Sequence, residues 1–171
     1  QDGNIVPLLA KSWEVSPDRT TYTFHLQDNV TFTNGKKFTA DDVVFSINRV
    51  KTDWKISLKS AMDVVANVEK KDDLTVVVTL SKPSNSWLYR MTTRIGAMFS
   101  RDGVSDLANT PVGTGPYKLE SWRRGDSITF VRNENYWGTK PKLDKVVLKY
   151  FKDATAMNNA LLTGGIDGIS T

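Results

Sequence analysis

The chain has 171 residues, of which 39% are hydrophobic and 25% are charged, and it contains no cysteine. This composition is typical of a globular protein with a sizeable core, and it excludes disulfides, thiolate metal sites and thiol catalysis. The net charge is +4, and the basic residues are scattered along the chain instead of forming a stripe. Nucleic-acid binding is therefore not expected, and no apolar run approaches the roughly 20 residues that a membrane span needs.

Alternating apolar residues predict strands near the start of the chain. Tyr22, Phe24 and Leu26 alternate with polar residues, which is typical of a half-buried strand. Residues 30–33 are predicted to form a second strand. The Asn-Gly pair at 34–35 then predicts a hairpin-type turn.

Apolar residues at helical spacing predict a helix over about residues 40–50. Thr39 precedes it as the expected N-terminal cap, and Asp41 and Asp42 suit the positive end of the helix. Neighbouring helical side chains point about 100° apart. We therefore interpret the two aspartates as first-turn residues and not as a catalytic pair.

In the middle of the chain, residues 65–87 have patterns that predict secondary structure, whereas residues 91–100 have none that is regular. Residues 65–80 read as a hairpin, and Ser84 is predicted to cap a short helix that carries Trp87. Residues 91–100 mix small, polar and apolar residues. We expect a strand or crossover there that passes close to another group, since Gly96 and Ala97 leave room.

Two polar-aromatic bends define the second half. Residues 111–117 read Pro-Val-Gly-Thr-Gly-Pro-Tyr and residues 132–138 read Arg-Asn-Glu-Asn-Tyr-Trp-Gly, with a predicted hairpin between them. We expect the rest of the chain to pack around this pair of bends. Further on, Asp153 is predicted to cap a helix, and a strand is predicted to begin at Ile166. A strand that begins at the last residues indicates a piece of a longer protein.

Catalytic signals are nearly absent. His25 is the only histidine and has no expected partners for general-base or metal chemistry. The Gly-Thr-Gly-Pro bend lacks the third glycine and the helix of a dinucleotide fingerprint. Trp54 stands in an irregular polar stretch, where it either covers the core or is offered to a ligand.

Several stretches, taken together and in order, resemble one family. They are residues 7–15 (PLLAKSWEV), 22–26 (YTFHL), 35–46 (GKKFTADDVVFS), 113–117 (GTGPY), 132–138 (RNENYWG) and 161–167 (LLTGGID). The chain resembles the extracellular solute-binding proteins of family 5, the peptide- and nickel-type receptors of ABC importers.

The resemblance implies a mixed α/β, type II periplasmic-binding-protein-like fold with mostly antiparallel hairpins and a few short helices. It implies that residues 1–171 are most of the first of two lobes, without the extreme N-terminus and the second lobe. The expected function is capture of a solute outside the membrane and delivery to an ABC permease. A peptide sensor on the same scaffold is the alternative, and an α/β enzyme is a third hypothesis.

The same resemblance indicates where solute contacts would lie. The loop after the first helix would supply Trp54, and the stretch before the Gly-Thr-Gly-Pro-Tyr bend would supply Thr93, Arg94 and Ala97. Arg94 either pairs with a solute carboxylate or forms a surface ion pair. No metal site, catalytic residue or cofactor is expected. The solute stays open among peptide, nickel chelate, oligosaccharide and opine. The protein is expected to be monomeric, to be periplasmic or extracellular, and to be held at the membrane by a lipid anchor or the permease.

Overall fold

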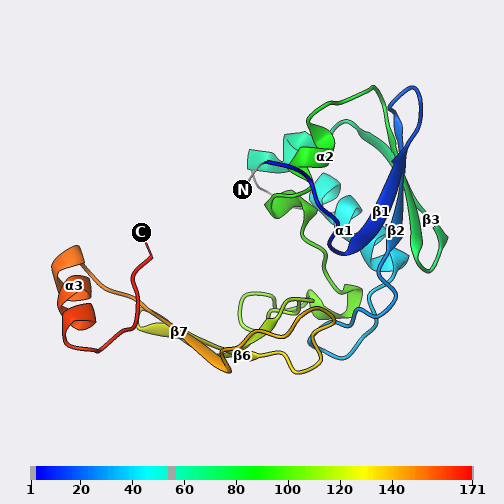
Figure 1. The fold of residues 1–171 in the computed structure, drawn as a ribbon. Coiled ribbons are helices and arrows are strands. Elements are labelled where there is room, and N and C mark those ends of the chain that lie inside the picture. The colour runs from blue at the N-terminus through cyan, green and yellow to red at the C-terminus, as the bar shows by residue number, and fades with distance from the viewer. Residues whose placement is uncertain (1–2, 54–56, 171) are drawn as a thin grey trace.

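Two antiparallel sheets form in this protein, in a computed structural model that describes residues 3–53 and 57–170. The first sheet has the strand order β1-β2-β4-β3 and the second has the order β5-β6-β7. Figure 1 shows β1, β2 and β3 of the first sheet and β6 and β7 of the second. The strands are β1 (Ala10–Val15), β2 (Thr21–Leu26), β3 (Val65–Asp72), β4 (Thr75–Leu80), β5 (Tyr117–Arg123), β6 (Ser127–Arg132) and β7 (Lys145–Lys149). The helices are α1 (Ala40–Thr52), α2 (Trp87–Arg90) and α3 (Ala154–Leu162), with 3₁₀ turns η1 (Ser57–Met62), η2 (Arg94–Gly96) and η3 (Arg101–Gly103). The predicted mixture of antiparallel hairpins and short helices is confirmed.

The main apolar core lies between the first sheet and α1. The spacing of Val43, Ile47 and Val50 places all three on one buried face of α1. Val76 and Val78 of β4 are completely buried in the same cluster. The expectation that the chain packs around its two glycine bends is therefore wrong. The aromatic residues of the bends, Tyr117, Tyr136 and Trp137, are only half-buried, and no residue of either bend belongs to the buried core cluster.

The predicted helix at residues 40–50 is confirmed and begins as expected. The backbone N–H of Thr39 donates to Asp42 Oδ2 at 3.0 Å, and the Thr39 hydroxyl donates to the same oxygen at 3.4 Å. This is the return half of a capping box, in which the third helical residue binds the cap. Asp41 and Asp42 are both first-turn residues, and the negative charge there is favourable at the positive end of the helix dipole.

The two bends do contact each other. The Asn133 side-chain amide donates to the Gly115 carbonyl at 3.1 Å, and its backbone N–H donates to the Pro116 carbonyl at 2.8 Å. The Trp137 indole N–H donates to the Thr114 carbonyl at 3.2 Å. Asn133 is buried, and its hydrogen bonds satisfy backbone groups that water cannot reach. The bends form a polar junction beside the second sheet and not a core.

Residues 30–33 do not form the predicted strand. They make a single bridge, between Thr31 and Lys37. The Thr33 N–H instead donates to the Gly113 carbonyl at 2.8 Å, so its backbone bonds a segment 80 residues away. The Asn-Gly turn itself is confirmed, with Gly35 at φ +81°.

Three further predictions need correction. Ser86, not Ser84, occupies the cap position of α2, and it makes no side-chain capping bond. Residues 91–100 contain the short turn η2 and no strand, because the segment folds back on its own backbone. Residues 166–169 also form no strand. By contrast, Asp153 caps α3 as predicted, since its Oδ1 accepts from the Ala156 N–H at 2.8 Å.

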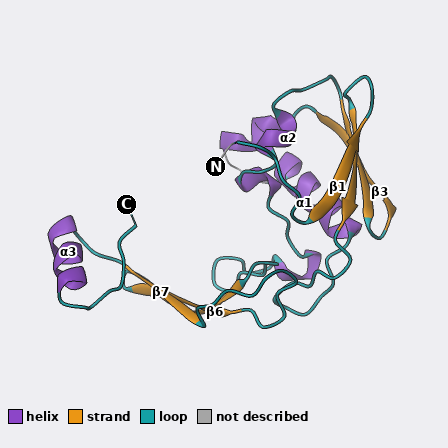
Figure 2. Cartoon of the chain, viewed as in Figure 1, coloured by secondary structure: helices purple, strands orange, loops and turns teal. Residues whose placement is uncertain are grey.

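The strands β6 and β7 and the helix α3 extend away from the first sheet (Figure 2). Several large apolar side chains of this part are exposed, namely Leu143, Val147, Leu148, Tyr150 and Leu162. Exposed apolar groups gathered in one region are typical of a surface that another protein segment covers. None of the helices in the described part of the chain combines the length and the apolar character that crossing a bilayer requires.

Candidate functional site

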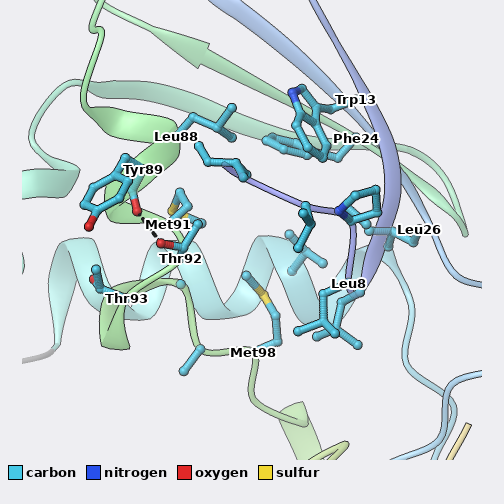
Figure 3. A pocket seen from close by; sticks show the side chains of 18 of the residues that line it. Leu8, Trp13, Phe24, Leu26, Leu88, Tyr89, Met91, Thr92, Thr93 and Met98 are labelled. Carbon is cyan, nitrogen blue, oxygen red and sulfur yellow. Dashed lines mark hydrogen bonds between the residues drawn. The ribbon is translucent and has the colours of Figure 1, made fainter. Parts of the chain in front are cut away.

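A cavity of about 690 Å³ opens on the first half of the molecule. Its walls come from the segment 3–10, from strands β1 and β2, from α1 and from residues 88–98 (Figure 3). Of the described residues that line it, none is charged. The cavity therefore offers mainly carbon surface, which suits apolar groups.

Strand pairing explains how aromatic side chains reach the cavity. Trp13 of β1 lies directly opposite Phe24 of β2, so both side chains stand on the same face of the sheet. Leu26 lies two residues further along β2 and faces the same way. On the opposite wall, Val43 and Ile47 of α1 complete the lining.

The segment from Met91 to Met98 forms the rim. The Thr93 hydroxyl donates to the Arg90 carbonyl at 2.7 Å, which leaves its oxygen able to accept a further hydrogen bond. Gly96 stands where a Cβ would lie 1.8 Å from the Met91 carbonyl oxygen. Only glycine permits this approach, so the sequence prediction that Gly96 passes close to another group is correct. That group belongs to the same segment.

The four predicted site residues have different outcomes. Thr93 and Ala97 both line the cavity and are both exposed. Arg94 lies between them in the chain and is exposed, but it is not among the residues that line the cavity. Trp54 lies outside the described residues. The assignment of these four residues to a solute site stays a prediction.

Sequence reasoning did not place Leu8, Met91 and Met98 at the site, although all three line the cavity (Figure 3). Leu8 is 64% exposed, which is high for leucine. It belongs to a segment held by Gln27, whose N–H donates to the Leu9 carbonyl at 2.9 Å. An exposed leucine, with two methionines at irregular spacing, gives no periodic signal. Their shared location becomes visible only in three dimensions.

No group of three or more potential metal-binding side chains occurs within residues 3–53 and 57–170. His25 Nε2 lies 3.3 Å from Glu14 Oε1, across the β1–β2 pair. Both side chains are substantially exposed. This contact is a pair on the surface of the sheet, and Glu14 is a partner that the sequence analysis did not predict for His25.

The fold defines the class of protein. It superposes with a TM-score of 0.87 and 32% identity on NikZ from Campylobacter jejuni, solved in complex with Ni(L-His), over 94% of this chain and 34% of that chain. It superposes with a TM-score of 0.84 and 32% identity on DppA from Helicobacter pylori, solved with the peptide STSA, over 96% of this chain and 37% of that chain. The architecture is that of part of a type II periplasmic binding protein.

Sequence comparison gives the family. The chain belongs to the bacterial extracellular solute-binding proteins of family 5, because the model described as "Bacterial extracellular solute-binding proteins, family 5 Middle" matches residues 4–171. It is 34% identical over 191 residues to the "Peptide transport periplasmic protein SapA" of Salmonella typhimurium strain LT2. That match covers 95% of this chain and 35% of the relative. The chain thus spans about a third of the length of the relatives it matches.

Proposed function

We propose that residues 1–171 form most of the first lobe of a two-lobed solute-binding protein. This protein is the substrate-binding component of an ABC importer. It captures a small solute outside the membrane, in the periplasm or at the cell surface, and delivers it to the permease. The observation that carries the proposal is the match of 94–96% of this chain to about a third of two solute-binding proteins at TM-scores of 0.84–0.87. We assign no catalytic step to the protein.

The solute class that the site favours is peptide-like. Arg94 is exposed beside the cavity rim and has no ion-pair partner in the described part of the chain, so its guanidinium is available to a carboxylate. Thr93 offers a hydroxyl oxygen, and Ala97 leaves space for the solute on the same rim. Trp54 is the fourth proposed contact. One structural neighbour was solved with a peptide and another with a nickel–histidine complex, so a metal chelate is the second solute class.

The mechanism that follows is closure by population shift. A solute that contacts both lobes binds the closed form more tightly than the open form, and this difference in affinity moves the equilibrium towards closure. The first lobe supplies the rim at residues 93–97, and the closed form is the one that the permease recognises.

Filling the rim should weaken solute binding. Ala97→Trp places a large indole where the solute would lie, and we expect it to weaken binding by roughly tenfold or more, equivalent to about 1.4 kcal/mol. The measurement is native mass spectrometry of the two-lobed protein, with the solute that it retains through purification. Ala66→Trp is the matched control, since Ala66 is exposed on β3 and does not line the cavity. Equal solute occupancy in both variants would contradict this site.

A further inference from the structure

The segment that carries Thr93, Arg94 and Ala97 is not held by a sheet. Residues 91–100 contain only the short turn η2, and none of them belongs to a strand. A short 3₁₀ turn is easily displaced, because its backbone makes few hydrogen bonds to other segments of the chain. A site built on this segment needs anchors from elsewhere in the fold.

Ser46 of α1 is the first anchor. It is 1% exposed, and its hydroxyl oxygen accepts from the Phe99 N–H at 2.8 Å. The same hydroxyl donates to the Asp42 carbonyl at 2.6 Å, one helical turn back. A buried serine in a helix can satisfy its hydrogen on its own helix in this way, which leaves its oxygen free to accept from another segment. Ser46 therefore fixes the backbone two residues after Ala97.

Asp42 is the second anchor. Its side chain is buried, and Oδ1 accepts from the Arg101 N–H at 3.3 Å and lies 3.5 Å from Arg101 Nε. Arg49 adds a third contact, with its guanidinium carbon 5.2 Å from the centre of the Phe99 ring. Positions 42, 46 and 49 are spaced by four and three residues, so they share one face of α1. One helix face thus holds three points of the loop from Phe99 to Arg101.

We propose that Ser46 and Asp42 are positioning residues of the solute site, which hold the rim segment in its binding geometry through Phe99 and Arg101. The inference rests on the proposed function, and it adds that affinity depends on side chains of α1 that do not touch the solute. A rim that is ordered before binding loses less conformational freedom when the solute arrives, and this increases affinity. Loosening the anchors should therefore weaken binding without changing any contact atom.

The test compares Ser46→Ala with two control variants in the two-lobed protein. Ser46→Ala removes the acceptor of the Phe99 N–H. Val50→Ala lies one turn further along α1 and lowers global stability without removing a bond to the loop. Ser81→Ala removes a hydroxyl that donates to the Val64 carbonyl, away from the rim. Backbone amide exchange is measured at Phe99, Ala97 and Gly96, and affinity is measured by calorimetry with the peptide Ser-Thr-Ser-Ala and with Ni(II)–L-histidine as probes.

Ser46→Ala should speed amide exchange at these three positions by about tenfold, which corresponds to the loss of one hydrogen bond. It should weaken binding of the probe by roughly fivefold to tenfold. Both controls should leave local exchange and affinity close to those of the wild type once global stability is taken into account. Asp42→Asn should act in the same direction as Ser46→Ala.

Two results would overturn the inference. One is unchanged exchange at Phe99 in Ser46→Ala. The other is faster exchange with unchanged affinity, while Ala97→Trp still weakens binding as predicted. Failure of the proposed function looks different, because Ala97→Trp would then bind the probes, and the solute retained through purification, as the wild type does. In that case the exchange data alone decide whether Ser46 anchors the loop.

Discussion

Trp87→Ala is expected to destabilise the protein by about 3–5 kcal/mol, the usual cost of removing a fully buried aromatic side chain. Trp87 is completely buried. Its ring centre lies 4.9 Å from that of Tyr22 and 6.2 Å from that of Phe24. The substitution therefore leaves a cavity between α2 and β2 that rigid neighbours cannot fill. Urea unfolding followed by circular dichroism measures the change in the free energy of unfolding.

Trp87→Phe separates packing from hydrogen bonding. The Trp87 indole N–H is buried and has no acceptor in the described part of the chain. Phenylalanine removes this unsatisfied donor and keeps most of the ring, so we expect a loss of less than about 1.5 kcal/mol. A loss as large as that of the alanine variant would show that the indole N–H is satisfied after all. A loss below about 1 kcal/mol for Trp87→Ala would contradict the packing argument itself.

Gly96→Ala is expected to have the second-largest effect, about 3 kcal/mol of destabilisation together with a loss of solute affinity. The added Cβ would lie 1.8 Å from the Met91 carbonyl oxygen and 2.6 Å from its carbon. Both atoms are backbone, so the segment has to move as a whole, at the upper end of the range for overpacking. That movement displaces Thr93 and Ala97 on the rim of the cavity. Urea unfolding and calorimetry with the solute measure the two effects.

Gly113→Ala is the matched control for Gly96→Ala. A Cβ at Gly113 would meet no atom within 4 Å, and the backbone there is not in the left-handed region. We expect a change within about 0.5 kcal/mol. Equal stability of the two alanine variants would mean that the approach of Gly96 to Met91 does not constrain the rim.

The sequence predicted well those elements whose cause is local. Alternation predicted β2 from Tyr22, Phe24 and Leu26, and helical spacing together with Thr39 predicted α1. The strand predicted at residues 30–33 does not form, because the backbone of Thr33 bonds Gly113, which is 80 residues away. Residues 91–100 were predicted as a strand or a crossover, and the strand is absent because the segment turns back on its own backbone and is held by a serine side chain of α1. Periodicity carries no information about either contact.

The candidate site was predictable only in part. Thr93 and Ala97, which were predicted to lie in one stretch of solute contacts, both line the cavity, whereas Arg94 of the same stretch does not line it. Trp54 lies outside the described residues, so its role remains a prediction. The cavity itself could not be predicted, because its lining combines the segment 3–10, which has no regular pattern, with α1 and residues 88–98, which are distant in the sequence.

Solution X-ray scattering of the two-lobed protein, with and without the solute that it retains through purification, tests the central claim most directly. If this chain is the first of two lobes that close around a solute, adding the solute should reduce the radius of gyration. Ala97→Trp should prevent this reduction. A radius of gyration that stays the same at saturating solute would contradict the account.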